Sequence, residues 1–400
     1  MKHRDQIRQI AKKVNKSGQR SEMREKALPA DEVMAILERT RERDYSYDRF
    51  LSTMCTRPHP IAIKAHDMFL ETNLGDPGLF PGVAGLEEEV VRMLGELLGC
   101  PLARGYISTG GTESNIQAIR AAKNESGKCG GNIVVPASAH FSFDKIGDLL
   151  SLEVRKAELD SQLRVDLSSV ESLIDEHTAA LVGIAGTTEF GQVDPIEELS
   201  DLALEWGVHL HVDAAFGGFV LPFLDRSFAW DFSLPGVKSI TIDPHKMGLA
   251  TIPAGGLLFR NQECMNALET ETHYLTKARQ ASLTGTRSGA AAAATYAVMM
   301  HLGREGFREM VGYCMDLTDH LVRGAKEIGV EPLIEPVMNV VALRVPEPSK
   351  VRERLMDRDW HVSITREPNR ALRLILMGHM SHENVDLFLK DLKEVLSEFV

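Results

Sequence analysis

Hydrophobic and polar positions along residues 60–305 follow a pattern that predicts helices and strands in alternation. Between two strand patterns, Ile196 to Gly207 has the apolar spacing of a crossover helix, with Pro195 before it and a glycine at its end. The alternation predicts an α/β fold with a mainly parallel, doubly wound sheet covered by helices on both faces. Four apolar runs of strand length are each followed by polar residues: N-I-V-V-P, A-A-L-V-G-I-A, V-H-L-H-V and S-I-T-I.

A different pattern begins after this region. Gly303 to Gly329 has the spacing of one long amphipathic helix. A strand pattern, a helix at Lys350 to Asp359, a second strand pattern and a closing helix from His382 follow it. We therefore predict a large domain over residues 61–305 and a small C-terminal α+β domain over residues 306–400.

The first 26 residues are basic, with nine Lys or Arg against three Asp or Glu. Ile7, Ile10 and Val14 have helical spacing, which is typical of a solvated terminal arm or of a helix that wraps a partner subunit. Contact with a membrane surface and a role as an import signal are the alternatives. A further helix is predicted over Glu32 to Arg43, and we assign residues 1–60 to an N-terminal arm and helix.

Composition narrows the class of protein. With 400 residues and 44% hydrophobic content, the chain can bury the cores of two or three domains. Its net charge of −12 argues against a nucleic-acid groove. The five cysteines form no C-x-x-C pair, and the longest apolar run, Ala290 to Met300, is shorter than the roughly 20 residues of a membrane span. No signal peptide is visible, so we expect a cytoplasmic protein that binds neither nucleic acid nor membrane.

Two strand ends carry the chemistry of a cofactor. Asp213 and Lys246 each follow an apolar run. Pyridoxal phosphate needs a lysine amine to form a Schiff base and a carboxylate to keep its pyridine nitrogen protonated. An isolated lysine is usually a solvated surface residue. Here His140 and Thr187 end two further strand patterns, and ligands of open α/β sheets bind beyond the carboxyl ends of the strands.

The segment from Gly105 to Lys123 is the candidate for binding the phosphate. Glycines let a phosphate approach the backbone, and the first turn of a helix presents free N–H groups to it. An ordinary capped helix is the alternative, because Ser, Thr and Glu are common at helix starts. The residues concerned are Thr109, Gly110, Gly111 and Thr112.

Five motifs together carry a resemblance to a known family: T-G-G-T-E-S-N, A-H-F-S-F-D-K, I-A-G-T-T-E-F-G, H-V-D-A-A-F-G-G and I-D-P-H-K-M-G. In their order and spacing, the chain resembles the group II pyridoxal-phosphate decarboxylases, and among them most closely the archaeal L-aspartate/L-tyrosine decarboxylases, which share the segment at Asn73 to Phe80. The resemblance runs from Ser52 to the C-terminus. It implies a fold-type I large domain, a small C-terminal domain, and a homodimer with active sites at the subunit interface.

The resemblance also assigns residues around the cofactor. His140 falls where the family has the histidine that stacks on the pyridine ring, and His245 falls where it would contact the phosphate. Thr187 and Ala215 are further cofactor-binding candidates. From the residues alone, a histidine at a strand end is more often structural, and His245 could face away from its neighbouring lysine.

Three further residues are implied by the same resemblance. Thr286 would reach the phosphate of the neighbouring subunit's cofactor, or else it caps the helix that follows. Tyr274 would lie on a mobile loop that returns a proton to the α-carbon. Arg373 would bind the substrate carboxylate, since a guanidinium grips a carboxylate bidentately, or it forms an interdomain salt bridge.

These features lead to one functional interpretation and two alternatives. The resemblance implies α-decarboxylation of L-aspartate to β-alanine, of L-tyrosine to tyramine, or of both, in the direction of coenzyme A or methanofuran synthesis. Sphingosine-phosphate lyases share much of the motif set, so a carbon–carbon lyase is the first alternative. A non-catalytic dimeric scaffold is the second. Retention of Lys246, Asp213 and His140 together argues against a scaffold.

Overall fold

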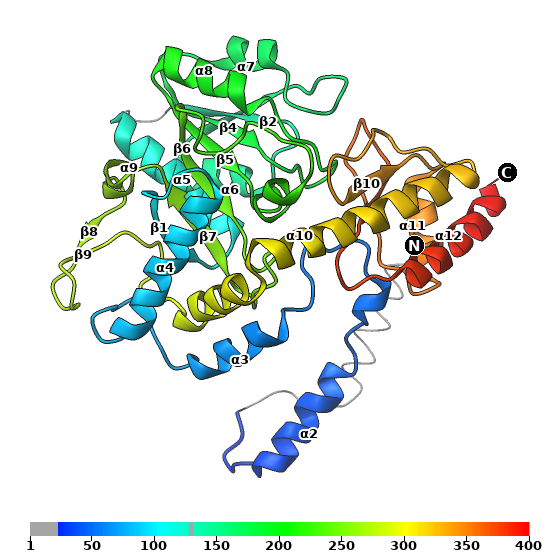
Figure 1. The fold of residues 1–400 in the computed structure, drawn as a ribbon, viewed down its shortest axis with the longest axis horizontal. Coiled ribbons are helices and arrows are strands. Elements are labelled where there is room, and N and C mark those ends of the chain that lie inside the picture. Colours follow the sequence, from blue (N-terminus) through cyan, green and yellow to red (C-terminus); the bar gives the residue numbers. More distant parts are fainter. Residues whose placement is uncertain (1–22, 128–130, 400) are drawn as a thin grey trace. The chain divides into compact units, whose positions relative to one another are not determined.

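The computed structural model describes residues 23–127 and 131–399. The chain divides into two compact units, residues 1–46 and residues 47–400 (Figure 1). All the site residues discussed below belong to the second unit.

The first unit contains one described helix. Helix α2 (Ala30–Arg41) confirms the helix predicted over Glu32 to Arg43, shifted by two residues. None of its residues is buried. The basic stretch predicted as a helix around Ile7 to Val14 lies outside the described residues.

A seven-stranded sheet forms the centre of the second unit, with the order β1-β7-β6-β5-β4-β2-β3. Strands β2 to β6 run parallel, while β7 is antiparallel to both of its neighbours. The predicted mainly parallel sheet is therefore confirmed. The strands are β1 (Arg104–Ser108), β2 (Asn132–Pro136), β3 (Glu153–Ala157), β4 (Thr178–Ile184), β5 (His209–Asp213), β6 (Val237–Ile242) and β7 (Gly255–Phe259).

Helices pack on both faces of this sheet (Figure 1). Strand β4 shows the reason, because successive residues of a strand point to opposite faces. Val182 packs with Ile119 of one helix, and Leu181 packs with Leu199 of another. The helices are α3 (Pro60–Met68), α4 (Pro81–Leu97), α5 (Gly111–Ser126), α6 (Ser142–Leu150), α7 (Leu167–Leu173), α8 (Ile196–Trp206) and α9 (Gln262–Asn266).

Helix α8 is the crossover helix that the sequence predicts. It ends at Trp206, and Gly207 follows with φ 63° in the left-handed region. That conformation favours glycine, which explains why the helix stops there. The helix thereby returns the chain to the start of β5.

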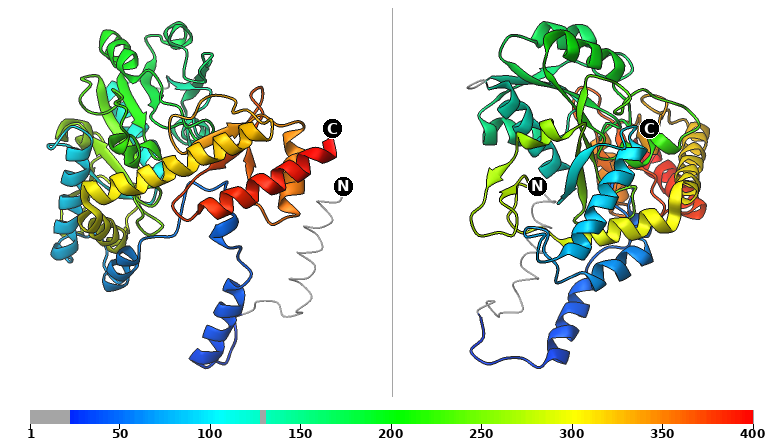
Figure 2. Two further views of the ribbon diagram at one scale, coloured as in Figure 1. Left: turned by 45° about the vertical axis from the view of Figure 1, so that its right-hand side comes forward. Right: turned by 60° about the vertical axis from the view of Figure 1, so that its left-hand side comes forward.

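A long helix, α10 (Gly289–Glu327), connects the large sheet to the C-terminal elements. It is interrupted at Gly303, where φ is 56° and ψ −170°. The helix predicted from Gly303 to Gly329 corresponds to the part after this kink. Two further views show that α10 runs beside the closing helix, α12 (His382–Leu396) (Figure 2).

The C-terminal elements have an apolar cluster of their own. A three-stranded antiparallel sheet, in the order β10-β12-β11, packs with helices around residues such as Trp360 and Phe388. Both predicted strand patterns and both predicted helices are confirmed, with small shifts in their bounds. The elements are β10 (Val340–Leu343), α11 (Pro348–Met356), β11 (Ser363–Ile364), β12 (Leu372–Ile375) and α12.

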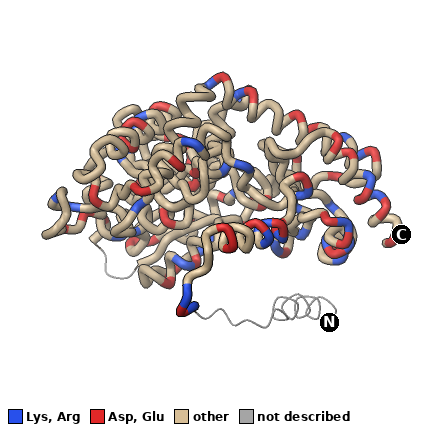
Figure 3. Tube along the Cα trace, turned by 90° about the horizontal axis from the view of Figure 1, so that it is seen from below, with Lys and Arg blue, Asp and Glu red and all other residues tan. Residues whose placement is uncertain are grey.

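Acidic and basic positions are mixed along the described chain (Figure 3). Within the described residues, none of the helices combines the length and the apolar character that a membrane span requires. Two short strands, β8 (Thr270–Glu271) and β9 (Arg279–Gln280), form a hairpin apart from the main sheet.

Candidate active site

A cavity of about 350 Å³ lies at the carboxyl ends of the parallel strands. It is the place where the four predicted strand ends meet, because β2, β4, β5 and β6 are neighbours in the sheet. The start of helix α5 forms a further wall. The polar lining residues are Thr109, Thr112, Glu113, Asn115, His140, Thr188, Asp213, Asp243, His245 and Lys246.

Lys246 is held by a carboxylate that the sequence analysis did not consider. Its Nζ lies 3.0 Å from Oδ2 of Asp243, whose side chain is buried. Burial alone would lower the pKa of Lys246, but Asp243 and Asp213 outweigh this effect and raise it. Within the described structure, Oδ1 of Asp243 is buried without a hydrogen-bond partner. The amine therefore enters the cavity beside a carboxylate with unused acceptor capacity.

Asp213 is fixed on both of its oxygens. Oδ1 accepts the backbone N–H of Ala215 at 3.1 Å, and Oδ2 accepts Nδ2 of Asn115 at 2.9 Å. The side chain is 6% exposed and still lines the cavity. Donors on both oxygens hold the carboxylate in one orientation.

His140 lines the cavity on another side. Burial lowers the pKa of His140, which favours the neutral imidazole. Its Nδ1 accepts the N–H of Ser142 at 3.2 Å, and the Phe141 ring lies 4.0 Å from it between centroids. A neutral ring held in this way presents a flat aromatic surface.

The glycines at the start of α5 keep a small space open. A Cβ on Gly110 would lie 3.2 Å from Cε1 of His245, and one on Gly111 would lie 3.0 Å from Oδ2 of Asp243. Gly110 also has φ 148°, which side chains rarely adopt. No side chain caps this end of the helix, so its first N–H groups face the cavity.

Nine of the sequence-predicted residues line this one cavity, and four do not. Thr187 is buried, and its Oγ1 accepts the N–H of Gln192, while the next residue, Thr188, lines the cavity. Tyr274 is 89% exposed. Thr286 is exposed too, and Ser288 is the residue that caps helix α10. The alternative interpretation of Thr286 as a helix cap is therefore wrong.

Arg373, the fourth of these, lies behind the cavity wall. Its Nε donates to the carbonyl of Thr188 at 2.5 Å. Its Nη1 donates to the Ser52 carbonyl at 3.1 Å and to Oγ of Ser363 at 3.0 Å. Burial lowers the pKa of Arg373 to about 10. The expected interdomain salt bridge is not present among the described ion pairs.

Sequence reasoning missed Asn115 and Asp243. Asn115 stands one helical turn after Thr112 and therefore faces the same side of α5. Asp243 stands three positions before Lys246. The two residues close a tight turn, in which the N–H of Lys246 donates to the carbonyl of Asp243. Spacing could have indicated both residues, but only the fold shows which carboxylate contacts the lysine.

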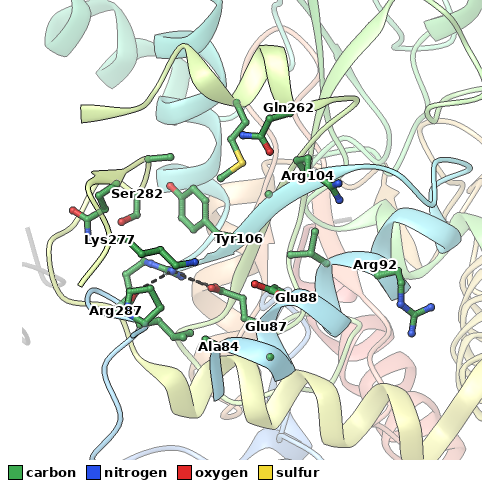
Figure 4. A pocket seen from close by; sticks show the side chains of 18 of the residues that line it. Ala84, Glu87, Glu88, Arg92, Arg104, Tyr106, Gln262, Lys277, Ser282 and Arg287 are labelled. Carbon is green, nitrogen blue, oxygen red and sulfur yellow. Dashed lines mark hydrogen bonds and ion pairs between the residues drawn. The ribbon is translucent and has the colours of Figure 1, made fainter. Parts of the chain in front are cut away.

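A second hollow, of about 910 Å³, lies between α4, β1 and the segment that leads from the hairpin to α10 (Figure 4). Arg287 donates there to Glu87 at 2.5 and 3.0 Å. Although it is larger, this hollow contains none of Lys246, Asp213 and Asp243. We therefore place the chemistry in the smaller cavity.

A lysine amine, a buried carboxylate and an open glycine turn at the end of a parallel sheet define a site of the pyridoxal-phosphate class. The conserved domain of pyridoxal-dependent decarboxylases matches residues 76–345. The chain belongs to this family. It is a carboxy-lyase with pyridoxal phosphate as its cofactor, which confirms the predicted enzyme class and cofactor and excludes the scaffold alternative.

Similar proteins agree with this assignment. A "Probable L-tyrosine/L-aspartate decarboxylase" of Methanothrix thermoacetophila is 69% identical over 372 residues, which cover 93% of this chain and 97% of that protein. A "Probable L-aspartate decarboxylase" of Archaeoglobus fulgidus is 53% identical and covers 91% of this chain and 99% of its own. The predicted resemblance is confirmed.

Solved structures share the fold. The sphingosine-1-phosphate lyase of Burkholderia pseudomallei has a TM-score of 0.87 at 28% identity, covering 95% of this chain and 93% of its own. The glutamate decarboxylase of Lactobacillus brevis has a TM-score of 0.86 at 21% identity, covering 95% of both chains. The predicted fold class is confirmed.

The residues of the cavity fit pyridoxal phosphate. The glycine turn leaves space that a single Cβ would fill, and uncapped N–H groups suit a phosphate. An ionised Asp213 suits a protonated ring nitrogen, and Lys246 provides the amine. The neutral ring of His140 supplies an aromatic surface.

Proposed function

We propose that this protein decarboxylates L-aspartate to β-alanine, L-tyrosine to tyramine, or both. The observation that carries the proposal is that Lys246, Asp213 and His140 share one cavity in a chain 69% identical to a protein of that name. The lyase alternative has weaker support, because the solved lyase is only 28% identical.

We assign roles to the cavity residues on the same basis. When bound, pyridoxal phosphate supplies an aldehyde that joins amines and a ring that takes up the electrons left by a departing carboxylate. Lys246 would hold the aldehyde, and Asp213 would keep the ring nitrogen protonated through a charge-assisted hydrogen bond, worth about 1.5–3 kcal/mol. His140 would provide an aromatic surface for the ring. Thr109 to Thr112, with Ala215 and His245, would bind the phosphate end and the ring edge. Thr187, whose side chain does not line the cavity, would act through its neighbour Thr188.

Arg373 is the proposed ligand of the substrate carboxylate. No carboxylate pairs with it among the described residues, and the acidic side chain that acts on it, Glu189, is paired with Arg366. A buried guanidinium that holds only neutral oxygens has charge left for an anion. Its contact with the carbonyl of Thr188 connects it to the cavity wall.

The remaining assignments concern assembly. We propose a homodimer in which Thr286 reaches the phosphate of the neighbouring subunit's cofactor and Tyr274 returns a proton to the α-carbon. Their exposure and the hollow beside Arg287 support this, since a partner subunit can cover them. We also propose a large domain over residues 61–305, a small one over 306–400, a cytoplasmic location, and a role in coenzyme A or methanofuran synthesis.

Product analysis tests the function directly. The cofactor-loaded protein is incubated with aspartate, tyrosine, glutamate and a pool of the other amino acids, and amines are identified by mass spectrometry. We expect β-alanine or tyramine with the parent protein and neither with Lys246→Ala. Lys390→Ala, a change of an exposed lysine on α12, serves as the matched control. Aldehyde release from phosphorylated amino alcohols without any amine would favour the lyase instead.

A further inference from the structure

A line of buried polar side chains leads from the cavity to the far end of strand β5. Residues 209, 211 and 213 of this strand point to one face, as the period of two requires. Helix α5 crosses that face, so residues from both of its ends take part. We call the following five residues the polar chain: Glu125, His209, Ser239, His211 and Asn115.

Each member of the polar chain contacts the next. His209 Nδ1 lies 3.3 Å from Glu125 Oε2, and its Nε2 lies 2.7 Å from Ser239 Oγ. Ser239 Oγ lies 2.8 Å from His211 Nδ1, and His211 Nε2 lies 3.0 Å from Asn115 Oδ1. Asn115 then donates to Asp213. The four inner members are at most 2% exposed, so water cannot replace these contacts.

The end at Asp213 sets the direction of the donors. An ionised carboxylate only accepts, so Asn115 must turn its NH₂ toward Asp213 and its oxygen toward His211. His211 must then carry a hydrogen on Nε2. Burial lowers the pKa of His211 to about 3, so the ring is neutral and its Nδ1 accepts from the hydroxyl of Ser239. Reversing the amide would set two oxygens against each other at Asp213.

The end at Glu125 completes the proton count. Four contacts separate Glu125 from Asn115, and each needs one hydrogen, whereas one hydroxyl and two neutral imidazoles supply three. The fourth hydrogen belongs to the contact between His209 and Glu125, which is the longest of the four at 3.3 Å and is shared between the ring and the carboxylate. Burial lowers the pKa of His209, and Glu125 opposes this effect only in part.

Four further contacts touch the polar chain without replacing it. At the outer end, Nζ of Lys238 lies 3.6 Å from Oε2 of Glu125, and the thiol of Cys264 donates to the same carboxylate. Asn115 Nδ2 also lies 3.2 Å from Oγ of Ser142, which uses its second hydrogen. Oγ1 of Thr241 lies 3.3 Å from His211 Nε2 and shares that hydrogen at longer range. Neither of these two hydroxyl contacts fixes which way the amide points, because a hydroxyl both donates and accepts.

We propose that the polar chain fixes the Asn115 amide and so holds Asp213 as an ionised acceptor for the ring nitrogen of the cofactor. Its members are positioning residues, because they act on the cofactor through Asp213. Of the five, Asn115 lines the cavity and the other four do not. The inference rests on the role proposed above for Asp213. It adds that His209, at the opposite end of β5 from Asp213, affects the protonation of the cofactor.

Ser239→Ala is the decisive variant, because Ser239 joins the two histidines and does not line the cavity. The apoprotein is loaded with pyridoxal phosphate labelled with ¹⁵N in the ring, and the ¹⁵N chemical shift is followed with pH in the absence of substrate. The dissociation constant of the cofactor is measured in parallel. We expect the parent protein to keep the ring nitrogen protonated, and Ser239→Ala to bind the cofactor about tenfold more weakly and lose the proton at lower pH.

Ser200→Ala is the matched control. Its hydroxyl is also buried and accepts the N–H of Gly236 at 2.9 Å, but it lies on α8, on the other face of the sheet. We expect it to lose stability without a change in the ¹⁵N titration. If Ser239→Ala titrates like the parent protein, the polar chain does not act on the cofactor and the inference fails.

Two more variants keep the test decisive. Glu125→Gln changes the partly exposed end of the polar chain, so it tests the inference even if Ser239→Ala does not fold. We expect the affinity for the cofactor to be about twofold to threefold weaker. An unchanged ¹⁵N titration in this variant would overturn the inference. Asp213→Ala must lose the ring proton, otherwise the role of Asp213 is wrong and the inference falls with it. The proposed reaction is tested separately, by whether the parent protein forms β-alanine or tyramine.

Discussion

The side chains of Arg287 and Arg373 are both largely buried, but their charges are balanced in different ways. Arg287 forms a two-fold contact with the carboxylate of Glu87, and its cation lies 5.0 Å from the centre of the Tyr106 ring. Glu87 and the other nearby groups outweigh burial and raise the pKa of Arg287. Arg373 donates to two carbonyls and one hydroxyl, and burial lowers its pKa.

The two arginines therefore have different roles. A buried ion pair with good geometry joins its elements, and removing one partner leaves a costly buried charge. Arg287 joins the start of α10 to α4 in this way. A buried cation held by neutral oxygens lowers stability in the free protein and is available to an anionic ligand. Proteins accept such a cost mainly at functional sites.

Breaking the ion pair of Arg287 should have the largest effect. We expect Glu87→Gln to lower the free energy of unfolding by about 3–5 kcal/mol, because it leaves the guanidinium buried without a counter-charge. Urea unfolding followed by circular dichroism measures the change. Glu88→Gln, at an exposed neighbouring position, should stay within about 0.5 kcal/mol. Equal effects of the two variants would contradict the importance of the ion pair.

Removing Arg373 should affect substrate more than stability. We expect Arg373→Met to raise KM for L-aspartate by about 10-fold to 100-fold, as for the loss of a charged hydrogen bond. Its free energy of unfolding should stay equal or rise, because a costly buried charge is gone. Steady-state kinetics and urea unfolding give both values. Arg370→Met, which removes an exposed arginine paired with Glu367, is the control; an unchanged KM in Arg373→Met would remove Arg373 from the binding site.

The pH dependence of stability sharpens the same contrast. The pKa of Arg373 in the folded protein, about 10, lies well below the ordinary value of a guanidinium, so the charge opposes folding at lower pH and this penalty declines as pH rises through 10. Between pH 9 and 11 the parent protein should gain about 1 kcal/mol of unfolding free energy relative to Arg373→Met. Parallel urea titrations measure the difference. A constant difference would mean that Arg373 is not destabilised by its burial.

The smallest effect concerns the turn next to Arg287. Ser288 accepts the N–H of Ala291 at 3.3 Å and caps α10, whereas Thr286 does not. We expect Ser288→Ala to cost about 1 kcal/mol of stability and Thr286→Ala to cost nearly none. Thermal unfolding of the two variants compares them. If Thr286→Ala also weakens cofactor binding in the dimer, the proposed contact across the interface is supported; a stability loss equal to that of Ser288→Ala would contradict the assignment of the cap.

The sequence predicted the local elements well where their pattern was strong. Helix α8 and strands β4 to β6 appear where apolar spacing, Gly207 and the polar strand ends indicated them. Strand β7 was not foreseen as an antiparallel neighbour of β6. Periodicity indicates that a segment is a strand but carries no information about its partner, which is decided by contacts between residues distant in the chain.

The amino-acid sequence by itself determined the alternation of elements, the cofactor and the family, because these depend on local spacing and on short motifs around residues such as Lys246. Only the tertiary structure decided which charges meet. It placed Asp243 against Lys246, and Asn115 between Asp213 and His211. Among the described residues, it placed Glu87 against Arg287 and no carboxylate against Arg373. Electrostatic interactions depend on distance and burial, and folding sets both.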